Sequence, residues 1–204
     1  MKQDKTYATR QPSWLRRAGI ATALFALSAT GALAQQPNAK IGLFLELTGG
    51  SASTTSEASQ FGVELAVKEI NAAGGIAGRK LDIVVADTQT DPTVGVGEIK
   101  RLIQQDKVDF VFGPVISQIL LAAAPVMNEA KVGAIGSTGS LSITPQSAPY
   151  YFSTLINAET QAKYVASEAG NVLKAKSVAI LSHTGAQAKD FVEAIKKELA
   201  ARNI

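Results

Sequence analysis

The residues of this sequence best suited to chemistry are small hydroxyl and glycine residues that follow short apolar runs. Three runs carry them, and the candidate set is Thr48, Gly49, Ser117, Ser137, Thr138 and Gly139. Hydroxyl groups and free backbone N–H groups hydrogen-bond polar molecules. Ser117 is predicted to cap the start of a helix, where unpaired N–H groups and the helix dipole favour an anion. Their types make the loops that carry them candidates for holding the polar head of a small ligand.

The signatures of common enzymes are missing. The chain has one histidine, His183, and it lacks the Gly-x-Ser-x-Gly elbow, the P-loop and a Gly-x-Gly-x-x-Gly run after a strand. A Ser-His-Asp hydrolase needs a positioned base, and this histidine is predicted in a loop. Asp87 and Asp91 are better explained as a strand end and a helix cap before Pro92 than as metal ligands. The sequence predicts no enzyme, no cofactor and no metal.

Residues 1–34 have the composition of a secretory signal peptide. Arg16 and Arg17 precede an apolar run, and small residues end the segment at Ala32-Leu33-Ala34. The alternative is a membrane anchor, but the apolar run is shorter than the ~20 residues that a spanning helix needs. We expect cleavage after Ala34 and export to the periplasm by the general secretory route. Because the sequence contains no cysteine, we expect neither a disulfide nor a lipid anchor, and no stable membrane insertion.

The formal net positive charge of +3 comes entirely from this leader. Residues 1–34 contain five Lys or Arg and one acidic residue, which leaves 15 basic and 16 acidic groups in the remainder. A nearly neutral body has no electrostatic reason to bind nucleic acid. We therefore expect a small molecule as the ligand.

Apolar runs and helix-periodic segments alternate along the rest of the chain. Strands are predicted at residues 41–45, 81–87, 108–112, 132–135 and 150–152. Between them, helices are predicted at 57–71, from Asp91 to at least Ile103, and at 117–130. This order predicts an α/β fold, a doubly wound parallel sheet with helices on both faces. Ligands of such sheets bind at the carboxyl ends of the strands, where the candidate residues are predicted to lie. A helix at 158–173, a strand at 177–181 and a helix at 190–202 follow.

Several stretches resemble a known family in content and order. The most specific one is the run at residues 69–81, and the others are 41–49, 62–67, 112–114 and 149–152. They are similar to type I periplasmic binding proteins of the branched-chain amino acid (Leu/Ile/Val) class, the substrate-binding proteins of ABC transporters. The resemblance implies two lobes joined by a hinge. From this resemblance we expect a first lobe at residues 35–155. Residues 156–204 would be the beginning of a second, truncated lobe.

The resemblance also implies roles for individual residues. A hydroxyl at Ser117 and backbone groups at Ser137 would hold the ligand, while a position that is usually threonine falls on Gly139. Thr138 or Ser140 would then supply the missing hydroxyl. The aromatic residue that often closes the cleft from the second lobe corresponds to Gln187.

The function implied is an extracytoplasmic receptor that delivers an amino acid, or a related organic acid or amide, to the permease of an ABC importer. Two alternatives remain open at this point. One is the ligand-sensing ectodomain of a signalling receptor, which needs a transmembrane helix further along the chain. The other is a secreted hydrolase, which needs a catalytic base from elsewhere.

Overall fold

A five-stranded parallel sheet forms the centre of the computed structural model, which describes residues 36–50 and 54–204. Its strands are β1 (Ala39–Leu45), β2 (Leu81–Asp87), β3 (Phe110–Phe112), β4 (Ala134–Gly136) and β5 (Tyr151–Ser153), in the spatial order β2-β1-β3-β4-β5. Every pair of neighbouring strands is parallel, as the alternating pattern predicts. The predicted signal peptide and its cleavage after Ala34 lie outside the described residues.

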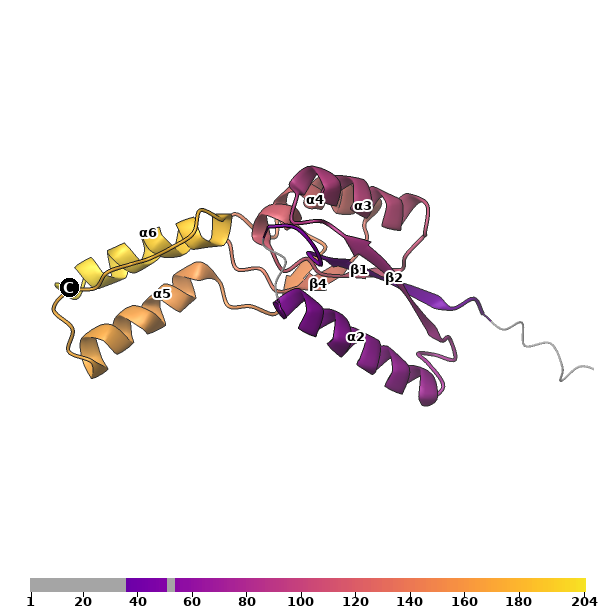
Figure 1. The fold of residues 1–204 in the computed structure, drawn as a ribbon, viewed down its shortest axis with the longest axis horizontal. Coiled ribbons are helices and arrows are strands. Elements are labelled where there is room, and N and C mark those ends of the chain that lie inside the picture. Colours follow the sequence, from indigo (N-terminus) through magenta and orange to yellow (C-terminus); the bar gives the residue numbers. More distant parts are fainter. Residues whose placement is uncertain (1–35, 51–53) are drawn as a thin grey trace, which may run out of the picture. The chain divides into compact units, whose positions relative to one another are not determined.

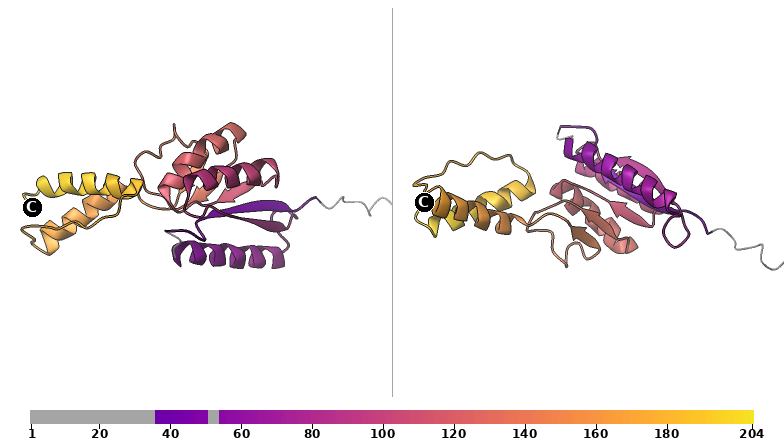
Figure 2. Two further views of the ribbon diagram at one scale, coloured as in Figure 1. Left: turned by 45° about the horizontal axis from the view of Figure 1, so that its top comes forward. Right: turned by 90° about the horizontal axis from the view of Figure 1, so that it is seen from below.

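Helices cover both faces of the sheet and connect its first four strands, whereas a loop joins β4 to β5. The helices of this part are α2 (Thr54–Ala72), α3 (Pro92–Gln104) and α4 (Ser117–Ala130). Helices α3 and α4 lie side by side on one face, and α2 lies on the other (Figures 1 and 2). Asp91 caps α3 by accepting hydrogen bonds from the N–H groups of Thr93 and Val94, at 2.6 and 3.0 Å. The cap predicted at Asp91 is thereby confirmed.

The main core lies between the sheet and helices α3 and α4. It is formed by buried apolar side chains: Phe44, Ala86, Ile99, Leu102, Val108, Val111, Ile119, Leu120, Ala123, Met127 and Ala134. Strand β1 is buried along its last four residues, which is typical of a central parallel strand covered on both faces. This core fixes the carboxyl ends of β1, β3 and β4 relative to the start of α4.

The last part of the described chain is helical. It comprises α5 (Ala158–Ser167), a π-helical turn η1 (Glu168–Val172) and α6 (Ala186–Ala200), and α5 packs beside α6 (Figure 1). A second apolar cluster joins these helices: Ala162, Ala166, Ala169, Ile195 and Leu199. None of the helices that the structure describes is both long and apolar enough to span a membrane.

The predicted strand at residues 177–181 is wrong. The structure has no strand there, and Leu181 is fully exposed. A strand is stable only when its backbone groups pair with a neighbouring strand, and within the described residues this segment has no such neighbour. An apolar run reports a tendency to be buried, and it does not by itself provide a pairing partner. The last helix also begins at Ala186, earlier than predicted.

Candidate functional site

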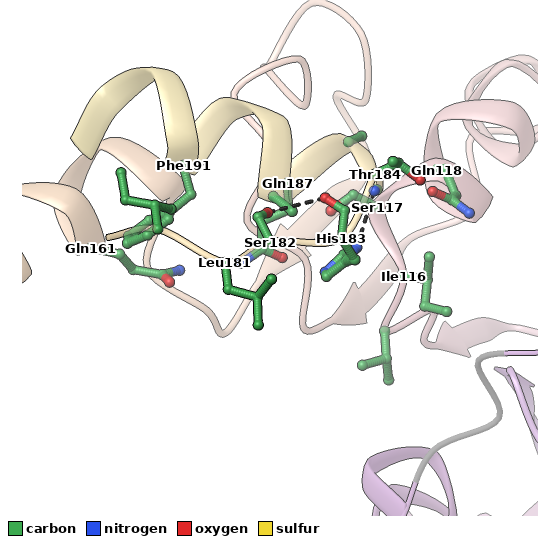
Figure 3. A pocket seen from close by; sticks show the side chains of 15 residues that line it. Ile116, Ser117, Gln118, Gln161, Leu181, Ser182, His183, Thr184, Gln187 and Phe191 are labelled. Carbon is green, nitrogen blue, oxygen red and sulfur yellow. Dashed lines mark hydrogen bonds between the residues drawn. The ribbon is translucent and has the colours of Figure 1, made fainter. Parts of the chain in front are cut away.

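A pocket of about 680 Å³ opens at the start of helix α4. One wall is the turn and first residues of α4, at 115–118, and the other is the segment 180–188 with Phe191 of α6 and Gln161 of α5. Figure 3 shows these two walls and the polar side chains they carry. The volume is within the range that holds small organic ligands.

Ser117 is the most informative residue of this pocket. The residue is 4% exposed, and its hydroxyl has no hydrogen-bond partner among the described residues. Buried hydroxyl groups are nearly always hydrogen-bonded, because an unpaired one costs free energy. An unpaired hydroxyl that lines a pocket is therefore a natural contact for a ligand.

The predicted role of Ser117 as a helix cap is wrong. Ile116 occupies the cap position and makes no side-chain cap bond, while Ser117 is the first residue inside the helix. The N–H groups of Ile119 and Leu120 both bond the carbonyl of Ile116, at 3.1 and 3.3 Å. Helix geometry leaves the N–H groups of Ser117 and Gln118 without an intrahelical acceptor. Because Ile116 makes no side-chain cap bond, the N–H groups of Ser117 and Gln118 are left for a ligand near the positive end of the helix dipole.

Gly113 sets the direction of the turn that leads to Ser117. Its φ is +107°, and a Cβ atom there would lie 1.9 Å from the carbonyl oxygen of Phe44. Only glycine fits such a backbone conformation and so close an approach. The turn at residues 113–116 is thus pressed against the end of β1.

Glu46 holds the same turn from the inside, and no sequence pattern singles it out. The residue follows β1, is fully buried, and accepts hydrogen bonds from the N–H groups of Val115 and Ile116, at 3.2 and 3.3 Å. Ser56 of α2 donates a longer one, at 3.4 Å. Burial raises the pKa of Glu46, and these hydrogen bonds offset only part of that effect.

The loop after β4 carries three of the predicted ligand-binding residues and lies beside the turn at 113–116. The N–H of Ser137 donates to the carbonyl of Pro114 at 3.3 Å. The Thr138 hydroxyl donates to that of Tyr151 at 3.1 Å, and a Cβ on Gly139 would lie 2.8 Å from the amide nitrogen of Gln187. These residues do not line the pocket, and their contact with a ligand stays a prediction.

Thr48 and Gly49 belong to a separate turn at the end of β1. The hydroxyl of Thr48 donates to Asp87 at 2.5 Å, and its N–H donates to the same carboxylate at 3.1 Å. Burial alone would raise the pKa of Asp87, but the bonds from Thr48, Gln89 and Leu47 lower it overall. Gly49 has a φ of +96°, and a Cβ there would meet the carbonyl oxygen of Gln89 at 2.0 Å. This geometry explains the two residues without a ligand, and neither lines the pocket.

Hydrogen bonds from the loop after β4 also reach helix α6. Asp190 accepts them from the buried hydroxyl of Ser140 at 2.5 Å and from the N–H of Leu141 at 2.8 Å. Ser140 and Asp190 lie 50 positions apart in the sequence, so no local sequence pattern predicts their hydrogen bond. Asp190 thereby ties the pocket-lining start of α6 to the sheet.

The second wall of the pocket presents neutral polar groups. The Nδ1 atom of His183 accepts a hydrogen bond from the N–H of Gly185 at 3.0 Å. The other polar side chains of this wall are Gln161, Ser182, Thr184 and Gln187. Ile180, Leu181 and Phe191 supply apolar surface between them. The two walls together suit a molecule with a polar head and a less polar body.

These features define an α/β protein with a pocket at the carboxyl ends of a parallel sheet. The chain belongs to the periplasmic binding protein family, whose model matches residues 38–204. It is 32% identical over 165 residues to the Leu/Ile/Val-binding protein BraC3 of Rhizobium johnstonii, covering 80% of this chain and 44% of that protein. An amino acid binding protein of Pseudomonas aeruginosa is 33% identical over 140 residues, which cover 68% of this chain and 37% of that protein.

Solved structures show the same fold. The branched-chain amino acid transporter substrate-binding protein LivJ of Streptococcus pneumoniae, in complex with isoleucine, superposes with a TM-score of 0.74 at 28% identity, covering 79% of this chain and 46% of that one. A solute-binding protein of an ABC transporter from Rhodopseudomonas palustris, in complex with 3,4-dihydroxybenzoic acid, gives 0.72 at 28% identity, covering 81% and 45%. The fold is the type I periplasmic binding protein fold, and the chain spans about half the length of these relatives.

Proposed function

We propose that this protein is an extracytoplasmic receptor that binds a small polar solute and delivers it to an ABC importer. The observation that carries the proposal is the unpaired, buried hydroxyl of Ser117 at the open start of α4, inside a pocket. The site offers donors and the positive end of a helix dipole to an anionic head group. It lies at the carboxyl ends of the strands, where sheets of this kind bind their ligands.

The lining of the pocket narrows the class of ligand. Among the residues that form it, His183 is the one titratable side chain, and none is a lysine, an arginine or a carboxylate. An anionic head is therefore held by dipoles rather than by a cation. This favours an amino acid, whose charges balance, or a small organic acid or amide. The ligands named for two similar structures, isoleucine and 3,4-dihydroxybenzoic acid, both carry a carboxylic acid group.

The mechanism that we propose is capture followed by closure. The polar head binds first at Ser117 and the neighbouring N–H groups, and the body of the ligand then contacts the segment 180–188. Closure around the ligand shields these hydrogen bonds from water, and hinge closure of this kind is well described for periplasmic binding proteins. The closed form is the one that engages the permease. We propose no catalytic step, because the pocket lining offers neither an acid–base pair nor an activated nucleophile.

Export to the periplasm belongs to the same proposal. It rests on the signal-like composition of residues 1–34, with cleavage after Ala34. The hydrolase alternative gains no support, because the pocket lining offers no acid–base pair. The importer role is favoured over the sensory alternative by the similar structures, which are named as binding proteins of transporters.

Replacing Ser117 by alanine tests the proposed site. Isothermal calorimetry on the complete protein should first identify a binder in a panel of L-leucine, L-isoleucine, 4-hydroxybenzoate and a simple amide. In S117A, binding of that ligand should weaken by roughly 1–3 kcal/mol, because a hydrogen bond to a charged head is lost. Ser59→Ala is the matched control, since Ser59 lies in α2 and does not line the pocket.

Two results would contradict the proposal. One is a panel that gives no binding heat with a folded protein. The other is a ligand that binds S117A, S59A and the unchanged protein equally well, because Ser117 would then have no part in recognition.

A further inference from the structure

Glu46 is a buried carboxyl group without a cationic partner. It is fully buried, and no ion pair within the described residues includes it. Its partners are the two backbone N–H groups at the start of α4 and the hydroxyl of Ser56. A buried charge without a counter-charge is costly, so folded proteins keep such groups mainly where they serve a function.

The position of Glu46 links it to the candidate ligand site. Its carboxylate bonds the N–H of Ile116, and the next residue along the chain is Ser117. Val115 and Ile116 both line the pocket, whereas Glu46 does not. The backbone of Val115 and Ile116 is therefore bonded to the carboxylate of Glu46, while these two residues also line the pocket. A ligand anion on the free donors of Ser117 would then lie on the same turn as the buried carboxyl group of Glu46.

We propose that Glu46 makes ligand binding proton-linked, taking up a proton when an anionic head group binds at Ser117. This inference rests on the proposed function. Two like charges in one buried site repel each other, and the repulsion is relieved when one of them is neutralised. The linkage makes the protein bind carboxylate ligands more tightly as the pH falls, and release them more easily as it rises.

In the unliganded protein, the direction in which the pKa of Glu46 is shifted agrees with this assignment. Burial already raises the pKa of Glu46, which brings its titration closer to neutral pH. A bound anion raises it further, so protonation and anion binding favour each other.

Other titratable groups near the turn do not explain such a linkage. Burial, with the charge of Glu46, raises the pKa of Tyr151 of β5 to about 12, so this tyrosine stays protonated. The pKa of Asp87, at the end of β2, is lowered overall, so it stays charged. Helix α2 presents the hydroxyl of Ser56, and α4 presents backbone N–H groups. His183 faces the pocket from the other wall and is the competing proton acceptor that the experiment must separate.

Calorimetry on the complete protein measures the linkage, with L-leucine and 4-hydroxybenzoate as probes. Binding heats in two buffers of different ionisation enthalpy give the number of protons taken up, without any substitution. We expect net proton uptake, and an affinity that rises by up to about tenfold for each pH unit on acidification. Glu46→Gln should abolish both effects, whereas His183→Asn, which alters the pocket wall and lowers the affinity itself, should keep the proton uptake. Zero uptake by the unchanged protein, or uptake that disappears in H183N and persists in E46Q, would overturn the assignment.

A second readout needs no ligand and separates this inference from the proposed function. In the unliganded protein, the amide proton signals of Val115 and Ile116 should titrate with an inflection above the usual carboxyl range, because they donate to Glu46. Amide signals that do not titrate would overturn the inference even if the probes bind. Titrating signals with no binding of any probe would instead count against the proposed function.

Discussion

At the scale of single residues, the contacts around the pocket join parts of the chain that are far apart in sequence. Asp190 of α6 receives hydrogen bonds from the hydroxyl of Ser140 and the N–H of Leu141. Bonds to a charged acceptor are stronger than neutral ones, and Ser140 is 3% exposed. This pair is therefore expected to contribute measurably to the position of the start of α6.

A double-mutant cycle measures that contribution. We expect Ser140→Ala and Asp190→Ala to show a favourable coupling of about 1–2 kcal/mol in the free energy of unfolding, obtained from urea titrations. Glu193→Ala is the control on the same helix, because Glu193 makes only an exposed ion pair with Lys196 at 3.8 Å. Additive effects of the two substitutions would show that the hydrogen bond is not formed in solution.

The role of a residue could be predicted from the sequence where its hydrogen-bond partners lie close to it along the chain. The cap at Asp91 was predictable because its hydrogen bonds stay within three positions of the chain. Ser117 was predictable as a pocket residue from its place after a strand, but its role as a cap was not correct, since Ile116 takes that position. Glu46 and Asp190 were not predictable, because their partners lie 69 or 70 and 49 or 50 positions away.

At the scale of elements, the end of β3 and the start of α4 are joined by a turn that only glycine permits. We expect Gly113→Ala to destabilise the protein by about 2 kcal/mol or more, because its positive φ and its approach to Phe44 both disfavour a side chain. Thermal and urea unfolding followed by circular dichroism measure the change.

Gly97→Ala is the matched control for this substitution. Gly97 is exposed within α3, and a Cβ atom there would meet nothing within 4 Å. Alanine favours a helix over glycine, so this variant should be unchanged or more stable by up to about 1 kcal/mol. Equal behaviour of the two variants would show that the turn relaxes to accept a side chain.

Strands were predicted correctly where an apolar segment is buried and also pairs with a neighbouring strand. The apolar runs at β1 and β2 became strands because each has a parallel neighbour in register along its whole length. The run at 177–181 has similar composition, yet it has no neighbour within the described residues and stays irregular. Pairing depends on other segments, so composition alone does not determine it.

At the scale of the whole molecule, the order of elements was sufficient to predict the fold class. Alternating strands and helices require right-handed crossovers and a parallel sheet, and the family resemblance specified which such sheet. The site was predicted only as a region, because many loops end at the same edge of a sheet. Side-chain packing then decided that Ser117 lines the pocket while Thr48 and Gly49 form a separate turn.

The most direct test of the central claim is a crystal structure of the complete protein with the tightest binder of the calorimetric panel. We predict that the polar head of the ligand lies within hydrogen-bonding distance of the Ser117 hydroxyl or of the free N–H groups at the start of α4. The body of the ligand should contact the segment 180–188. A ligand bound at another face, with the Ser117 hydroxyl still unpaired, would contradict the proposed site.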